Sequence, residues 1–299
     1  MLSPNLTPIP WHRFMDFISP AADRITILEE TMKEAGLEYK VTEIAGSRHL
    51  VIVPPSSPEQ RKIMGRHPPI ILLAHYDRAE GSPGANDNSA GVFLLIETAI
   101  KLIKKNVINW LIIFTDREEL KTGEKIKAQG AYSLAEGLKN LKMEKAKIFC
   151  FDACGSGDTL IISTTLEFLI KKEVSGEKIK DSMLELRNFA LNTARDLNMA
   201  KVLLIPTPFS DDVGFFRAGL NAQTITMLPS SECIRLVADL RKNPELAEAF
   251  ISAKMKQASR SISIPDTWRG LNSPFDSHLR LTPENFRTVV RFAEALCSG

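Results

Sequence analysis

Residues 69–91 read PIILLAHYDRAEGSPGANDNSAG and contain two segments of different character, with a third directly after them. The apolar run at 70–74 has the length and composition of a buried strand. The loop at 75–91 holds one His, two Asp, one Glu, two Asn and three Gly, and almost nothing that needs burial. Apolar residues then recur at helical spacing from Val92 to Ile103. A strand, a loop rich in potential ligands and a helix indicate an α/β fold with a functional site at the strand end.

The rest of the chain repeats this alternation. Further buried-looking runs occupy 110–114, 147–151, 202–205 and 224–228. Helical patterns cover 13–35, 89–105, about 129–141, 180–199, 212–218, 232–255 and 283–297, and two short strands are predicted near 39–45 and 49–54. Strands that alternate with helices favour an α/β three-layer sandwich, with a central, mostly parallel mixed sheet and helices on both faces. We expect residues 1–299 to form a single catalytic domain that includes the N-terminal helix and strands of 1–68.

Composition excludes several classes of protein. The chain has 299 residues, 38 Lys plus Arg against 36 Asp plus Glu, and a net charge of +2, which favours neither nucleic acid nor an anionic membrane as partner. It has no apolar run of 18 residues and no leader with a basic and then an apolar region. The four cysteines form no CxxC pair, so free thiols and a cytoplasmic location are predicted.

Polar side chains follow three of the predicted strands. They are His75 and Asp77 after 70–74, Glu118 and Glu119 after 110–114, and Asp152 after 147–151, with Asp87 just before the next helix. Each alone has an ordinary explanation as a cap, a turn or a solvated residue. Ligands in open α/β sheets bind at the carboxyl ends of the strands, so these groups are expected to converge. An imidazole among several carboxylates suits zinc, with manganese or cobalt as second choices.

These residues, in this order and spacing, resemble the co-catalytic zinc aminopeptidases, the family of the bacterial leucyl aminopeptidases and glutamate carboxypeptidase. The matching segments are His75-x-Asp77, Gly84–Gly91, Glu118-Glu119, Asp152, and Ser210-Asp211 with Phe215 and Gly219. The resemblance runs from about residue 69 to the C-terminus. The combination is specific, whereas each piece alone is not.

The resemblance implies a peptide substrate, two zinc ions and a role for each residue. One ion would be held by His75 and Asp152, the other by Glu119 and a late histidine, and Asp87 would bridge them. Asp77 would orient the imidazole of His75. Glu118 would be the general base that takes a proton from the attacking water and returns it to the leaving amine.

The sequence departs from the family pattern at the late histidine. The family has a segment like H-T-P-x-D-T about eleven residues before its last helix, and counting back from Pro283 reaches Asn272, in Asn272-Ser273-Pro274-Phe275-Asp276-Ser277. Asparagine therefore stands where the histidine is expected. His278, six residues later, is predicted as the ligand, and Asn272 remains the alternative. A second departure is the longer segment from Leu120 to Gln129 before Gly130-Ala131, where the family usually has Gly-x-x-Gly-Ser soon after the glutamates.

Three functions follow from this pattern. The first is a metallo-aminopeptidase. The second is a transferase like glutaminyl cyclase, which shares the fold and uses a single zinc. The third is a relic of the fold that binds without catalysis, and the preserved base and bridging carboxylate argue against it. The pattern leaves open the choice between aminopeptidase, carboxypeptidase and dipeptidase, the side chain preferred, and the oligomeric state.

Overall fold

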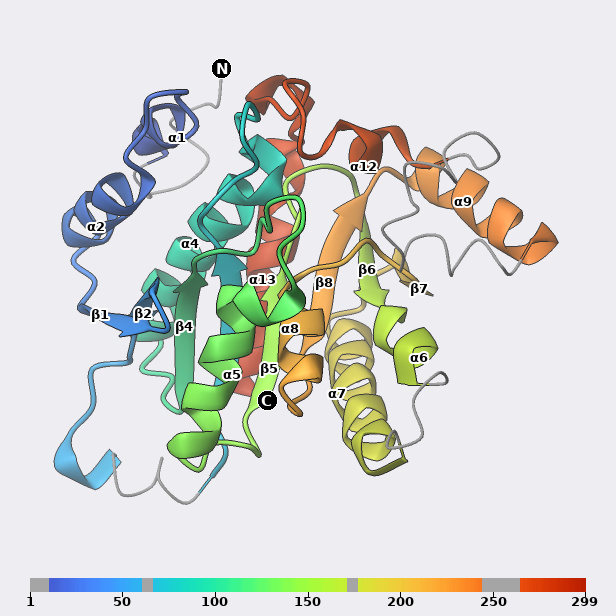
Figure 1. The fold of residues 1–299 in the computed structure, drawn as a ribbon. Helices are drawn as coiled ribbons and strands as arrows, with labels where there is room; N and C mark the ends of the chain where they lie inside the picture. The colour runs from blue at the N-terminus through green and yellow to red at the C-terminus, as the bar shows by residue number, and fades with distance from the viewer. Residues whose placement is uncertain (1–10, 61–66, 171–176, 244–263) are drawn as a thin grey trace.

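The computed structural model describes residues 11–60, 67–170, 177–243 and 264–299. Within these ranges, eight strands form one mixed sheet in the order β1-β2-β4-β3-β5-β8-β6-β7 (Figure 1). The strands are β1 (Tyr39–Ile44), β2 (Ser47–Ile52), β3 (Ile70–His75), β4 (Trp110–Thr115), β5 (Lys147–Phe151), β6 (Thr159–Ser163), β7 (Val202–Ile205) and β8 (Gln223–Leu228).

The middle of the sheet is parallel. β3 pairs in parallel with β4 and β5, and β5 with β8, while β1, β2 and β6 bring antiparallel pairs to its two sides. The register places Leu73 opposite Ile113 of β4 and Cys150 of β5. The carboxyl ends of these three strands consequently lie side by side at one edge of the sheet.

Helices cover both faces of the sheet (Figure 1). They are α1 (His12–Phe17), α2 (Arg24–Glu34), α4 (Gly91–Lys104), α5 (Gly130–Asn140), α6 (Thr165–Ile170), α7 (Glu177–Asp196), α8 (Asp211–Arg217), α9 (Ser230–Lys242), α12 (Asp266–Gly270) and α13 (Phe286–Ser298). Single-turn elements are η1 (Ala85–Ala90), η2 (Ile126–Ala128), η3 (His278–Arg280) and η4 (Pro283–Asn285).

Alternation along the strands builds two cores. On β3, Leu72 packs with α4, α7 and α13, whereas Ile71 and Leu73 pack with α5 and α8 on the opposite face. This is the period of two expected of a strand covered on both sides. Each fully buried aliphatic or aromatic side chain contributes roughly 1.5–3 kcal/mol to folding. The predicted α/β sandwich is thereby confirmed.

The structure differs from the sequence expectation in its details. The helical pattern at 13–35 is two helices, α1 and α2, because a turn containing Pro20 separates them and Asp23 caps the second. β6, a short strand just after Gly157, was not predicted. The expected helix at 232–255 is α9 as far as Lys242, and its remainder lies outside the described residues.

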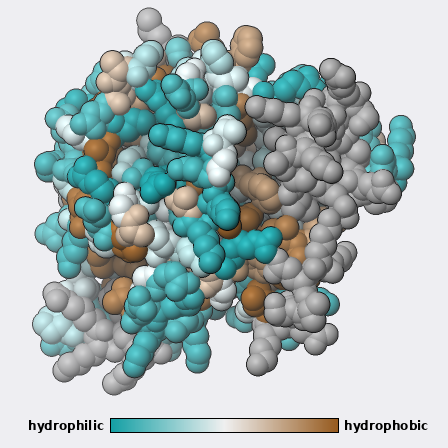
Figure 2. All heavy atoms as spheres, viewed as in Figure 1, coloured by the Kyte–Doolittle hydropathy of each residue, from teal (hydrophilic) through white to brown (hydrophobic). Residues whose placement is uncertain are grey.

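None of the helices in the described ranges combines the length and the apolar character that crossing a bilayer requires. On the face shown in Figure 2, hydrophilic residues predominate and apolar ones are scattered among them. All four cysteines are buried and free, as predicted.

Candidate metal centre

The strand ends bring the predicted site residues to one edge of the sheet. His75 is the last residue of β3 and pairs with Thr115, the last residue of β4. Glu118 and Glu119 lie in the turn that follows β4, and Asp152 directly follows β5. Because β3 lies between β4 and β5, the imidazole is flanked by acidic residues from both neighbouring strands.

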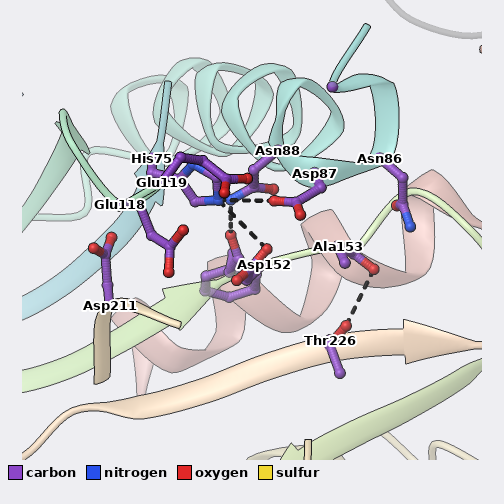
Figure 3. Close-up of polar contacts among 12 residues, drawn as sticks. His75, Asn86, Asp87, Asn88, Glu118, Glu119, Asp152, Ala153, Asp211 and Thr226 are labelled. Atoms are coloured by element: carbon purple, nitrogen blue, oxygen red, sulfur yellow. Dashed lines mark hydrogen bonds and ion pairs between the residues drawn. The ribbon is translucent and has the colours of Figure 1, made fainter. Parts of the chain in front are cut away.

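Three of these side chains form a compact group. His75 Nε2 lies 3.0 Å from Asp87 Oδ1 and 3.6 Å from Asp152 Oδ1 (Figure 3). One ligand atom from each of the three residues lies within 4.8 Å of the other two. The histidine side chain is only 1% exposed. These three atoms are therefore close enough together to bind a single cation.

Asp77 links the imidazole to the two glutamates. Its Oδ1 is 3.4 Å from His75 Nδ1, and its two oxygens accept hydrogen bonds from the backbone N–H groups of Glu118 at 3.1 Å and Glu119 at 3.0 Å. Burial opposes ionisation of Asp77, but the contact with His75 and these backbone donors outweigh it and lower its pKa. Asp77 thus stays ionised and leaves Nε2 of His75 facing the acidic group.

The loop that carries Asp87 is held by a distant part of the chain. It turns at Gly84, whose φ of 62° is in the left-handed region, and continues as η1. The carboxylate of Asp276 accepts hydrogen bonds from the backbone N–H groups of Asn86 at 2.8 Å and Asp87 at 3.0 Å. Asn86 Oδ1 in turn accepts from the N–H of Gly155, beyond β5. These bonds fix the backbone from which the Asp87 side chain reaches His75.

Glu118 and Glu119 lie beside this group. Burial raises the pKa of Glu119 to about 9, and the nearby carboxylate of Asp87 adds to the shift. Burial also raises the pKa of Glu118 well above its usual value. Glu118 Oε1 accepts a hydrogen bond from Gln129 Nε2 at 3.2 Å. Figure 3 shows Glu118 between the His75 group and Asp211, whose Oδ2 accepts from the Thr115 hydroxyl at 2.6 Å.

A cation fits this set of donors. Glu119 Oε1 and Asp152 Oδ1 are buried without a hydrogen-bond donor, and an orphaned buried oxygen is costly unless a positive charge compensates it. Burial and the neighbouring carboxylate of Asp152 raise the pKa of Asp87, which marks a surplus of negative charge. One imidazole nitrogen with several carboxylate oxygens is a donor set that zinc accepts.

Comparison with known proteins agrees with this chemistry. The model of peptidase family M28 matches residues 56–258, which is more than half of the chain. The chain belongs to peptidase family M28. The predicted relation to the co-catalytic zinc peptidases is thereby confirmed at the level of the family. A search of curated proteins found no significant match.

Solved structures share the M28 fold at low sequence identity. A zinc aminopeptidase from Bacillus subtilis aligns with a TM-score of 0.52 and 16% identity over 83% of this chain, which spans about half of that protein, 49%. A leucine aminopeptidase precursor from Bacteroides thetaiotaomicron aligns with a TM-score of 0.61 and 14% identity, over 95% of this chain and 93% of that one. A glutaminyl cyclase from Porphyromonas gingivalis aligns with a TM-score of 0.59 and 18% identity, over 96% of this chain and 94% of that one. These likenesses support the fold.

Both residues predicted as the late ligand, Asn272 and His278, lie in the segment after α12. Asp276 contacts the Asp87 loop, so this segment adjoins the site as the alignment through Asn272 requires. Asn272 itself is exposed and has a left-handed backbone, with φ of 57°. His278 is half-buried in η3, which packs beside η1. The compact group of three includes neither His278 nor Glu119.

Three buried polar residues near the site make contacts that the sequence did not indicate. Gln129 lies in the segment already identified as longer than usual, but nothing in the sequence indicated that its amide reaches Glu118. Asp276 was recognised only as a match to the late motif. Arg24, in α2, gave no signal because a lone arginine in an amphipathic helix is ordinarily at the surface.

Proposed function

We propose that this chain is a zinc-dependent exopeptidase that removes N-terminal residues from peptides. The observation that supports it best is the buried group of His75, Asp87 and Asp152, with Glu118 beside it. Membership of peptidase family M28 supports hydrolysis of a peptide bond as the reaction. Removal of residues from the N-terminal end is the finer part of the proposal.

The proposed ligands divide between two ions. His75, Asp87 and Asp152 would hold the first, and Asp87, Glu119 and His278 the second. When bound, zinc at such a site supplies Lewis-acid polarisation of the scissile carbonyl and lowers the pKa of a coordinated water from ~15.7 toward ~7.

The chain's own residues would manage the proton. Glu118 takes a proton from the attacking water and delivers it to the leaving amine. Its Oε1 is engaged by Gln129, which leaves Oε2 for the water. Asp77 holds Nδ1 of His75 and the backbone N–H groups of both glutamates, so that imidazole and base keep a fixed relation.

The activity is tested with aminoacyl anilides, peptides blocked at either end, and a peptide that begins with glutamine. The zinc-loaded chain is expected to cleave substrates with a free amino terminus and to spare N-acetylated ones, and Glu118→Gln is expected to lose activity at least 100-fold while keeping its zinc. Cyclisation of N-terminal glutamine without hydrolysis would instead identify a transferase. Bound zinc with neither reaction would identify a binding protein.

The second ion has its own test. Because His278 is the proposed imidazole ligand at the Glu119 side, His278→Ala is expected to reduce zinc from two ions per chain to one. Asn272→Ala is the matched variant for the alternative position. Loss of an ion in Asn272→Ala alone would transfer the role to Asn272.

We also propose that the chain acts as one catalytic domain in the cytoplasm. β1 and β2 extend the same sheet that carries the site, which supports a single domain that includes the N-terminal part. Four free, buried cysteines are compatible with a reducing compartment.

A further inference from the structure

Arg24 is a buried arginine that the proposed mechanism does not use. It is the first residue of α2 and lies outside the segment that matches the family. It is 7% exposed, and its Nε and Nη1 have no hydrogen-bond acceptor. A buried guanidinium with unpartnered donors carries a large desolvation cost, so its presence calls for a specific role.

The guanidinium contacts the loop that carries Asp87. Arg24 Nη2 donates to Ser89 Oγ at 2.6 Å, and the Ser89 hydroxyl donates onward to the carbonyl oxygen of Gly84. Nη1 lies 2.9 Å from the position that a Cβ on Gly84 would occupy, so a side chain there would displace it. The guanidinium carbon also lies over the ring of Phe17, 4.1 Å from the ring centroid, in a cation–π contact.

The same loop is fastened at two further points. Asp276, from the C-terminal part of the chain, accepts from the amides of Asn86 and Asp87. Arg78, at the start of the loop, donates to the carbonyl oxygens of Ile18, Ser19 and Pro20 between α1 and α2. The loop is therefore clamped between the N-terminal helices and the segment after α12, both of which lie near the start of α4 in Figure 1.

We propose that Arg24 is a positioning residue for the metal centre, because it holds the turn from Gly84 to Ser89 and thereby the carboxylate of Asp87. The inference rests on the proposed metal-binding function of Asp87. It assigns the N-terminal helices a part in metal binding, although the family match begins only at residue 56.

Two effects of Arg24 on a bound cation oppose one another. Its positive charge disfavours a second cation nearby, so removing the charge alone would strengthen zinc binding. Its hydrogen bond orders a ligand loop, and loss of such outer support typically weakens metal affinity 10- to 100-fold. Arg24→Lys keeps the positive charge but loses the planar guanidinium with its N–H donors. Arg24→Met loses the charge and the donors. The pair of variants separates the two effects.

The test measures the zinc dissociation constant by competition with a chelating dye, together with the thermal midpoint of the metal-free protein. Both Arg24→Lys and Arg24→Met are expected to bind zinc about 10- to 100-fold more weakly. The thermal midpoints of the metal-free variants distinguish a loss of zinc affinity from a loss of folding. Arg13→Met is the control, because Arg13 pairs with Glu34 within the same two helices but does not contact the loop.

Three outcomes would overturn the inference. Unchanged affinity in both variants would show that the loop holds its shape without Arg24. Tighter binding by Arg24→Met with wild-type affinity in Arg24→Lys would reduce Arg24 to a charge effect. Failure of wild type to bind zinc would remove both this inference and the proposed function, whereas zinc binding without hydrolysis would remove only the function.

Ser89→Ala supplies an independent check on the route of the effect. Since Arg24 is argued to act through the Ser89 hydroxyl, the losses in Arg24→Lys and Ser89→Ala are expected to be non-additive in the double variant. Fully additive losses would contradict the proposed route.

Discussion

Among single residues, Gln129 is the clearest case of a group whose role depends on one hydrogen bond. It is buried and donates to Glu118 Oε1, and a Cβ at Gly214 would overlap its amide oxygen. Replacing it by Met keeps the bulk but removes the donor. Hydrogen bonds to charged groups contribute about 1.5–3 kcal/mol, so Gln129→Met is expected to lower kcat by roughly 10-fold or more.

The measurement is steady-state kinetics at saturating zinc. KM is expected to change little, because Gln129 contacts the base. Lys125→Met, at an exposed position of the same segment, is the control and is expected to retain wild-type kcat. Wild-type kcat in Gln129→Met would show that Glu118 is oriented by other contacts.

His49 is a second residue with a measurable consequence. It is fully buried, neither ring nitrogen has a hydrogen-bond partner, and burial lowers its pKa from 6.5 to about 4, with Asp77 opposing the shift. Because the folded protein resists the proton that the unfolded chain accepts, stability is full above about pH 6.5 and falls as the pH drops toward 4. The loss from this group alone is about 3 kcal/mol.

His49→Leu is therefore expected to show a shallower loss of stability between pH 6.5 and 4 than wild type. Urea unfolding at several pH values measures it. His12→Gln removes an imidazole that is 70% exposed and is expected to follow the wild-type curve. Identical acid dependence in wild type and His49→Leu would mean that other groups dominate in this range.

At the scale of elements, the N-terminal helices depend on one aromatic side chain of α4. Phe93 is fully buried and packs against Trp11, Phe14 and Phe17, with ring centroids 5.3–5.7 Å away. Phe93→Ala would leave a cavity and is expected to cost about 3–5 kcal/mol in the free energy of unfolding. Leu141→Ala, at a residue that is 70% exposed, is the comparison and is expected to cost little. A loss below about 1 kcal/mol in Phe93→Ala would contradict this packing account.

The bounds of the helices and strands show which elements the pattern of apolar residues predicts and which it does not. The buried runs at 70–74, 110–114 and 147–151 predicted β3, β4 and β5 because their apolar character is continuous. β6 was not predicted, although its five residues, TLIIS, match the length of β5. The apolar spacing at 13–35 predicted one helix, because this spacing continues across the turn at Pro20 that separates α1 from α2.

At the scale of the whole molecule, the topology of the sheet explains why only part of the site could be predicted from the sequence. His75, Asp152 and the two glutamates follow strands directly, so the topology of a parallel sheet brings them together. The contact of Asp276 with Asp87 joins residues 189 positions apart and depends on the packing of a loop. Such a contact leaves no spacing signal in a single sequence.

The whole molecule should also respond to the metal. Zinc that binds only the folded state raises the free energy of unfolding by mass action. The gain is about 2.7 kcal/mol when free zinc is 100 times the dissociation constant. Urea unfolding with zinc and after chelation measures this difference. Equal stability in the two conditions would contradict a site that forms only on folding.

Elemental analysis of zinc per chain tests the central claim most directly. Wild type and His75→Ala would be purified without chelator, equilibrated with zinc and freed of loosely bound metal. We expect two zinc ions per wild-type chain and the loss of at least one in His75→Ala. A wild-type chain without zinc, or a His75→Ala chain that keeps all of it, would contradict the metal centre proposed for His75, Asp87 and Asp152.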